Sequence, residues 1–106
     1  MTWHAFGNGT SIGTKGSEGG TIVLDEEHEV GARITLEQDG QIAPWAITCG
    51  VYGLMFHTRF FAARPTAEAE YEAMKAALDE ILCQPGTPDF AELARLASDF
   101  VERFPT

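Results

Sequence analysis

Apolar and polar residues alternate along much of the segment 21–61, which is the period-2 pattern of half-buried β-strands. A short apolar stretch at 3–6 stands before this segment. The pattern predicts an antiparallel sheet of four or five strands, with one apolar and one polar face. The four alternating runs are 21–25, 30–37, 45–51 and 54–61.

Three turns connect these runs in the predicted sheet. Asp39-Gly40 is a strong signal for a two-residue hairpin, and Tyr52-Gly53 is a weaker one. A three-residue loop at 26–28 connects the first two runs. Each turn keeps apolar residues opposite apolar residues, whereas a slip by one residue would mix the two faces. The pairs that these turns predict include Leu24 with Val30, Ile34 with Trp45, and Cys49 with Phe56.

After residue 65 the apolar spacing changes to the period of a helix. Thr66 caps a first predicted helix that runs to about residue 83, where Pro85-Gly86 stops it. A Thr-Pro pair at 87–88 starts a second helix, which runs to about residue 104. The predicted apolar stripes are Ala67, Tyr71, Met74, Leu78 and Ile81 in the first helix, and Phe90, Leu93, Ala97, Phe100 and Phe104 in the second.

Together these elements predict an α+β fold in which two C-terminal helices pack on one face of an antiparallel meander sheet of four or five strands, as a two-layer sandwich. A chain of 106 residues forms one domain on length alone. We therefore expect a single domain over 1–106, with a loop at 7–20, strands within 21–61 and helices within 66–104.

The segment 7–20 contains six glycines and predicts a loop that is either flexible or tightly turned. It does not match a phosphate-binding loop, because Lys15 is followed by Gly16 instead of Ser or Thr. It does not match a dinucleotide fingerprint either, because Ile12 stands where that motif needs glycine. A ligand loop that carries Lys15 remains an alternative to a plain connection.

Net charge narrows the function classes. Seven basic and sixteen acidic residues give a formal charge of −9. This argues against general nucleic-acid binding, which needs a basic surface. We expect no membrane association and a cytoplasmic location, since no apolar run is long enough for a membrane helix and the first residues do not resemble a signal peptide. Cys49 and Cys83 form neither a disulfide framework nor a zinc motif.

Two candidate chemistries are disfavoured by the predicted register. The acidic run 25–29, which includes His28, lacks the spacing of a calcium loop, and strand alternation points neighbouring side chains apart. A solvated hairpin tip is therefore expected there. Cys49 and His57 fall on opposite faces, which excludes a Cys–His dyad. We expect no metal and no cofactor.

Several basic side chains are expected to lie together on the polar face of the predicted sheet. The register brings Arg33 and Arg59 to this face together with His57 and Thr48. Guanidinium groups suit carboxylate or phosphate, and an imidazole can act as an acid or base near neutral pH. Two alternatives are a wet face with neutralised arginines and an interface, because apolar residues share this face.

Two function classes follow. The first is a small acidic interaction protein without catalytic activity, which forms a homodimer or binds a basic protein partner. The second is a small-anion-binding or enzymatic site on the outer sheet face, built from Arg33, Arg59 and His57, with Thr48 beside them. In that second hypothesis the loop that carries Lys15 closes over the ligand.

Overall fold

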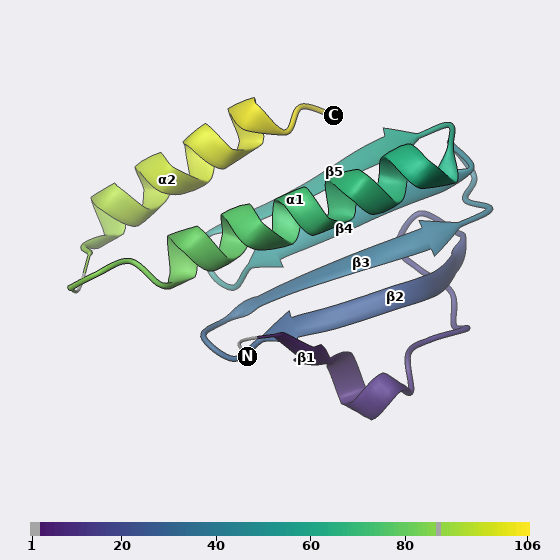
Figure 1. Ribbon diagram of the computed structural model, residues 1–106, viewed down its shortest axis with the longest axis horizontal. Coiled ribbons are helices and arrows are strands. Elements are labelled where there is room, and N and C mark those ends of the chain that lie inside the picture. Colours follow the sequence, from purple (N-terminus) through teal and green to yellow (C-terminus); the bar gives the residue numbers. More distant parts are fainter. Residues whose placement is uncertain (1–2, 87) are drawn as a thin grey trace.

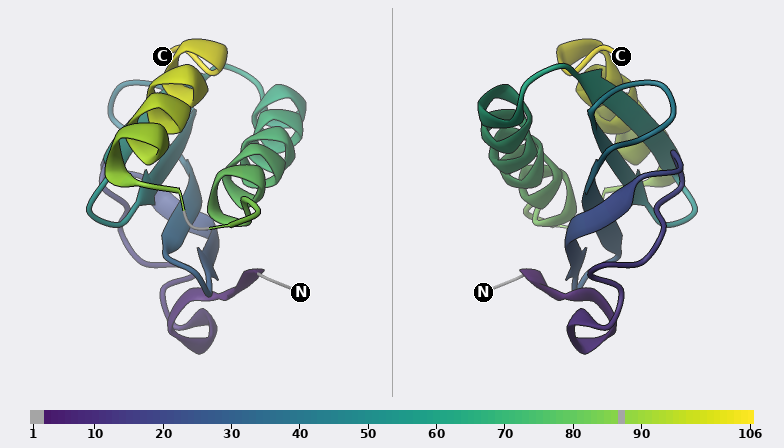
Figure 2. Two further views of the ribbon diagram at one scale, coloured as in Figure 1. Left: turned by 90° about the vertical axis from the view of Figure 1, so that its left-hand side faces the viewer. Right: turned by 90° about the vertical axis from the view of Figure 1, so that its right-hand side faces the viewer.

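The structure is a computed structural model that describes residues 3–86 and 88–106. Five antiparallel strands form one sheet in the order β1-β2-β3-β4-β5, and two helices cover one of its faces (Figures 1 and 2). This confirms the predicted meander with two C-terminal helices. The elements are β1 Trp3–Ala5, a 3-10 helix Phe6–Gly9, β2 Thr21–His28, β3 Ala32–Gln38, β4 Trp45–Val51, β5 Met55–Phe61, α1 Arg64–Leu82 and α2 Phe90–Arg103.

Helix α1 supplies most of the helical side of the core. It begins after Ala63 with Pro65 in its first turn, where proline is tolerated, and not at the predicted cap Thr66. Its predicted apolar stripe is buried against the apolar face of β3 and β4, and Tyr71, Met74 and Leu78 are completely inaccessible. The sheet residues in this core are Ala32, Ile34, Leu36, Ile47, Cys49 and Val51.

Helix α2 begins two residues later than expected, at Phe90. The carboxylate of Asp89 caps it by accepting a hydrogen bond from the backbone N–H of Glu92 at 2.8 Å. The predicted cap Thr87 lies outside the described residues. Phe90 was expected in the apolar stripe but is 70% exposed. The reason is its place in the first turn of α2, which projects beyond the ends of the strands (Figure 1).

Polar side chains also fasten α1 to the sheet. The Tyr71 hydroxyl donates to Glu26 at 2.8 Å, and the Lys75 ammonium donates to the same carboxylate at 2.9 Å. Two residues further along β2, on the same face, the His28 ring bonds Asp79 at 2.7 Å. Because these groups are partly or fully buried, the hydrogen bonds offset the cost of removing them from water.

The connection between β3 and β4 is longer than the predicted two-residue turn. Ile34 pairs with Cys49 and not with Trp45. A turn at Asp39-Gly40 would have placed Pro44 in the ladder, where it has no N–H to donate. The Pro44 carbonyl instead accepts a hydrogen bond from Asp39 N–H at 2.7 Å and closes a wider loop. The shift is an even number of residues, so the predicted faces of β4 are retained.

Strand β2 is longer than predicted, and the turn after it lies at 29–31. The predicted loop 26–28 is therefore wrong, because these residues belong to the strand and Leu24 pairs with Leu36 instead of Val30. An irregularity between Ile22 and Leu24 also changes the side-chain alternation there. Ile22 consequently faces away from Leu24 and is buried on the outer side of the sheet.

The connection between β4 and β5 contains one residue more than predicted. Gly53 has φ +76°, and Leu54 N–H bonds the Val51 carbonyl at 2.9 Å, so that Leu54 belongs to the turn. Cys49 therefore pairs with His57 and not with Phe56. A shift of one residue exchanges the two faces of a strand. The helix side of β5 carries Met55, His57, Arg59 and Phe61, and the outer side carries Phe56, Thr58 and Phe60.

Within residues 3–86 and 88–106, neither helix combines the length and the apolar composition that a membrane span requires.

Leu78→Ala is expected to lower the free energy of unfolding by about 2–5 kcal/mol, because it leaves a cavity between α1 and the sheet. Urea denaturation followed by circular dichroism measures this change. Ile42→Ala is the matched control, since Ile42 is 72% exposed in the β3–β4 loop and should change stability by less than about 0.5 kcal/mol. Equal effects of the two substitutions would contradict this packing.

Candidate functional site

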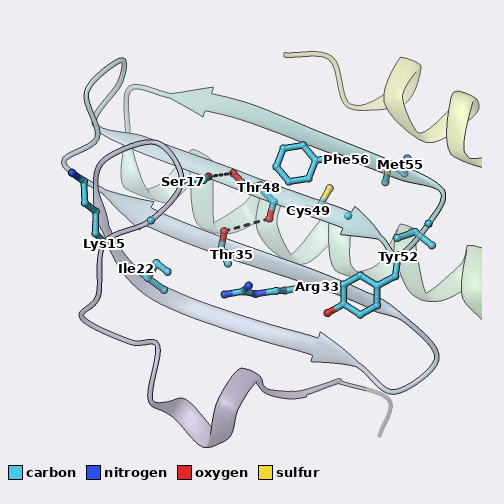
Figure 3. A pocket seen from close by; sticks show the side chains of 14 residues that line it. Lys15, Ser17, Ile22, Arg33, Thr35, Thr48, Cys49, Tyr52, Met55 and Phe56 are labelled. Atoms are coloured by element: carbon cyan, nitrogen blue, oxygen red, sulfur yellow. Dashed lines mark hydrogen bonds between the residues drawn. The ribbon is translucent and has the colours of Figure 1, made fainter.

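A hollow of about 510 Å³ opens on the outer face of the sheet, opposite the helices (Figure 3). Strands β3 and β4 form its floor, the loop at 15–17 forms one wall, and the β4–β5 turn with the start of β5 forms the other. Gly50 lies between Arg33 and Phe56 in the register and leaves room above the floor. The side chains labelled around it are Lys15, Ser17, Ile22, Arg33, Thr35, Thr48, Cys49, Tyr52, Met55 and Phe56.

The glycine-rich segment is seated on the sheet by the carboxylate of Glu37, which is completely buried. This carboxylate accepts hydrogen bonds from Gly20 N–H at 2.9 Å and from Glu18 N–H at 3.2 Å. A Cβ on Gly16 would collide with the same carboxylate, so a larger residue there would have to displace Glu37 from these hydrogen bonds. The predicted loop at 7–20 is therefore tightly turned, and its residues 15–17 form a wall of the hollow.

Arg33 is held in place from two sides. Its Nε and Nη2 donate to the two carboxylate oxygens of Asp25 at 2.9 and 2.6 Å, and its guanidinium lies 3.6 Å from the ring centre of Phe6. The hydrogen bond to Asp25 raises the pKa of Arg33, and burial opposes this shift. Because Asp25 occupies Nε and one edge of the fork, Nη1 remains as the donor that a ligand in the hollow can reach.

Hydroxyl groups cover the middle of the floor. Thr48 Oγ1 lies 3.3 Å from both Ser17 Oγ and Thr58 Oγ1. Thr35 Oγ1 donates to the backbone carbonyl of Thr48 at 3.4 Å. A hydroxyl can both donate and accept, so the groups of this row have further capacity to bond a polar ligand.

Two exposed aromatic side chains border the hollow. Tyr52 is 55% exposed and Phe56 is 73% exposed. The Tyr52 hydroxyl donates to Glu27 at 2.7 Å. Burial and this hydrogen bond raise the pKa of Tyr52 to about 12, so the phenol is neutral at physiological pH.

The structure brings three of the five predicted site residues together. Arg33, Thr48 and Lys15 all line the hollow, and Lys15 stands at its rim with its side chain extending away from Arg33 (Figure 3). The prediction that Arg59 and His57 share this face is wrong, because the extra residue in the β4–β5 turn sends both to the helix side.

Arg59 and His57 instead hold the end of the chain on the sheet. Arg59 donates to Glu70 at 2.7 Å and to the Pro105 carbonyl at 2.8 Å. The ring of His57 bonds the Phe104 carbonyl. These contacts engage both side chains away from the hollow, and they explain why two basic residues lie on the buried side of the sheet.

No family model, curated protein or solved structure matches this chain. What the protein does must therefore be inferred from its own residues.

Cys49 and His57 lie directly opposite each other on β4 and β5, so the prediction that they occupy opposite faces is wrong. They still do not form a catalytic dyad. Burial raises the pKa of Cys49 to about 12, which leaves almost no thiolate at neutral pH. The ring of His57 is also bonded to the Phe104 carbonyl.

The acidic run 25–29 lies largely within β2 and is not a hairpin tip. Its alternation does point neighbours apart, as predicted: Asp25 and Glu27 face outward, whereas Glu26 and His28 face α1. Each of these side chains has a protein partner, and the partners are Arg33, Tyr52, Lys75 and Asp79.

One group of side chains has the composition of a metal site. The ligand atoms of His28, Asp79 and Cys83 lie within 4.8 Å of one another. However, Nδ1 of His28 accepts a hydrogen bond from Val30 N–H at 3.1 Å, so Nε2 carries the proton and donates to Asp79. A metal-binding Nε2 must be unprotonated, with Nδ1 as the donor. The geometry is that of a hydrogen-bonded anchor for α1.

Glu37→Gln is expected to loosen the glycine-rich segment, because an amide has one acceptor oxygen and turns its NH₂ group toward the backbone donors. We expect a loss of about 1–3 kcal/mol in stability and faster hydrogen exchange at Gly20 N–H, both measured by NMR. Glu18→Gln is the control, since among residues 3–86 and 88–106 the Glu18 carboxylate bonds only the neighbouring Ser17 hydroxyl. Unchanged exchange in Glu37→Gln would show that this carboxylate does not seat the segment.

The His28 ring is expected to carry a proton on Nε2 and none on Nδ1, as measured by long-range ¹H–¹⁵N NMR of the imidazole ring. Equimolar Zn²⁺ should leave the His28 ring signals unchanged. A shift of the Nε2 signal on adding Zn²⁺, lost in Cys83→Ser, would instead establish a metal site.

Proposed function

We propose that the protein is a non-catalytic binding protein whose outer-face hollow takes a small organic carboxylate with an apolar body. The observation that carries this proposal is the charge of the lining. Among the described residues that line the hollow, Lys15 and Arg33 are charged and both are cationic, although the chain as a whole carries −9.

The carboxylate end of the ligand is assigned to Arg33. Its guanidinium is oriented in advance by Asp25 and Phe6, so binding costs little side-chain entropy. Asp25 compensates the charge of Arg33, and the ammonium of Lys15 at the rim therefore supplies the net attraction for an anion. The hydroxyls of Thr48 and Ser17 complete the polar contacts.

The apolar body of the ligand is assigned to the far wall. Phe56 and Tyr52 offer apolar surface there, and Ile22 offers more on the side of the loop. A volume of about 510 Å³ suits a small molecule, since ligand pockets usually measure about 300–1,000 Å³. Aromatic walls above a polar floor favour an amphipathic ligand over inorganic phosphate.

The chemistry of the groups near the hollow supports a binding function without catalysis. The candidate acid-base group His57 is on the other side of the sheet, and the raised pKa values of Cys49 and Tyr52 keep both groups neutral. A general base or nucleophile needs a group that is ionised, or close to it, near the operating pH.

An interaction protein is the second candidate, and the exposed aromatic residues Tyr52, Phe56 and Phe90 favour it. The hypothesis that this partner is a basic protein rests on the net charge of −9. For either candidate we propose the cytoplasm as the location, because Cys49 and Cys83 are free thiols, as is usual in a reducing compartment.

Phenylacetate is expected to stabilise the protein, whereas the neutral phenylacetamide and inorganic phosphate should not. At a ligand concentration ten times Kd the gain is about 1.4 kcal/mol, a shift of roughly 6 °C in Tm for a chain of this length, measured by thermal denaturation. Arg33→Lys keeps the charge but loses the fork, and it should weaken binding at least about tenfold.

Arg64→Lys is the matched control, because Arg64 is an exposed cation at the start of α1, far from the lining of the hollow. Equal stabilisation by the acid and its amide, or equal losses in the two Arg→Lys variants, would refute the carboxylate site.

A further inference from the structure

A groove of about 490 Å³ lies at the end of the molecule where α1 ends and α2 begins. The β2–β3 turn and the β4–β5 turn lie at this same end (Figure 1). None of the described residues that line the groove carries a charge. This end groove therefore offers an apolar contact surface. Its apolar side chains include Val30, Leu54, Ile81, Leu82, Phe90 and Leu93.

Two large apolar side chains of the end groove are open to water. Val30 on the β2–β3 turn is 58% exposed, and Phe90 in the first turn of α2 is 70% exposed. Neither residue belongs to the packed core of the described chain. Folding of the chain therefore does not account for them, and exposed apolar side chains beside an apolar groove are typical of a surface that a partner covers.

The surroundings of the end groove are negative. Helix α1 ends there, and a helix carries partial negative charge at its C-terminus. Its last turn holds no basic residue that would balance this charge. Desolvation and the nearby carboxylates of Asp79 and Glu29 raise the pKa of Cys83, which directly follows α1. The end of α1 therefore favours a positively charged group beside the groove.

The start of α2 lies at the same groove but does not offset this negative charge. The N-terminus of a helix carries partial positive charge, which a nearby carboxylate balances. Asp89 supplies that carboxylate, since it accepts the hydrogen bond from Glu92 N–H at 2.8 Å. Charge complementarity at the end groove therefore favours a cationic occupant.

The same charge decides between the classes of occupant. A second copy of this chain would bring a net charge of −9 to a negative surface, and an anionic lipid surface would also be repelled. A basic amphipathic helix meets both requirements. Its apolar residues recur three or four positions apart and can enter an apolar groove, and its Lys or Arg residues flank them.

We propose that the end groove docks a basic amphipathic helix of a protein partner. The apolar side chains of that helix lie between Val30 and Phe90, and its cations lie beside the C-terminal end of α1. This inference rests on the second candidate function above, to which it gives a defined surface. It does not rest on the carboxylate site, because neither Val30 nor Phe90 lines the hollow that contains Arg33.

A peptide titration followed by ¹H–¹⁵N NMR tests the docking. The probe is an acetylated and amidated helical peptide of about 15 residues with Leu on one face and Lys on the other, and its counterpart has Glu in place of every Lys. The Lys peptide should shift the backbone amide signals of Val30, Leu54 and Leu93, and leave those of Gly16 and Ser17 beside the other hollow unchanged. The Glu peptide should bind at least about tenfold more weakly.

Matched variants locate the contact. Phe90→Ser and Val30→Ser should each weaken binding of the Lys peptide at least about fivefold, because they remove apolar surface from the groove and leave the core intact. Ile42→Ser should have no effect, since Ile42 is 72% exposed in the β3–β4 loop at the opposite end of the molecule (Figure 1). Glu29→Gln should weaken binding about threefold, whereas Glu102→Gln makes the same change in net charge in the last turn of α2 and should not.

Several outcomes would overturn the docking. These are no binding of the Lys peptide, equal binding of the two peptides, and an equal loss in Ile42→Ser and Phe90→Ser. A concentration-dependent dimer that Phe90→Ser dissociates would assign the groove to a second copy and overturn the proposal as well. Stabilisation by phenylacetate is measured in the same variants and should be unchanged in Val30→Ser and Phe90→Ser, so the carboxylate site and the end groove are tested separately.

Discussion

The buried carboxylate of Glu37 is the contact on which the outer face of this protein depends. It is completely inaccessible, and backbone N–H groups of Glu18 and Gly20 are its hydrogen-bond donors. An anion in such a place is stable only while those donors stay in position, so the strand and the loop fix each other. Backbone hydrogen bonds of Thr14 and Glu18 and the Ser17 hydroxyl also hold the segment, but Glu37 is its completely buried contact with the sheet.

The two faces of the sheet use polar residues in opposite ways. On the helix side, Glu26, His28, His57 and Arg59 are each engaged with α1 or with the C-terminal segment. On the outer side, Arg33 and the row of hydroxyls are positioned but still have bonding capacity. Because buried polar groups must be paired, the first set contributes to stability and leaves little for a ligand. The second set keeps donors and acceptors that a ligand can bond.

Alternation and helical spacing were sufficient to predict the fold and the buried stripe of α1, because these patterns follow from burial alone. They could not predict the face of each β5 residue. Phenylalanines occur at both even and odd positions of this strand, Phe56 and Phe60 at even ones and Phe61 at an odd one. Either register therefore buries apolar surface. The conformation of Gly53 in the turn selects the register that is observed. Of the residues that line the hollow, Arg33, Thr48 and Lys15 were candidates from the sequence, whereas Phe56 and Tyr52 were not.

The register of β5 also links the hollow to the helix side of the sheet. With a two-residue turn, Phe56 would lie in the core and Arg59 would stand on the outer face beside Arg33. The hollow would then lose its aromatic wall, and Glu70 would lose its cation. The three-residue turn reverses both outcomes, since it moves Arg59 to Glu70 and leaves Phe56 exposed. One backbone conformation at Gly53 thus sets the chemistry of the hollow and the anchoring of the C-terminal segment together.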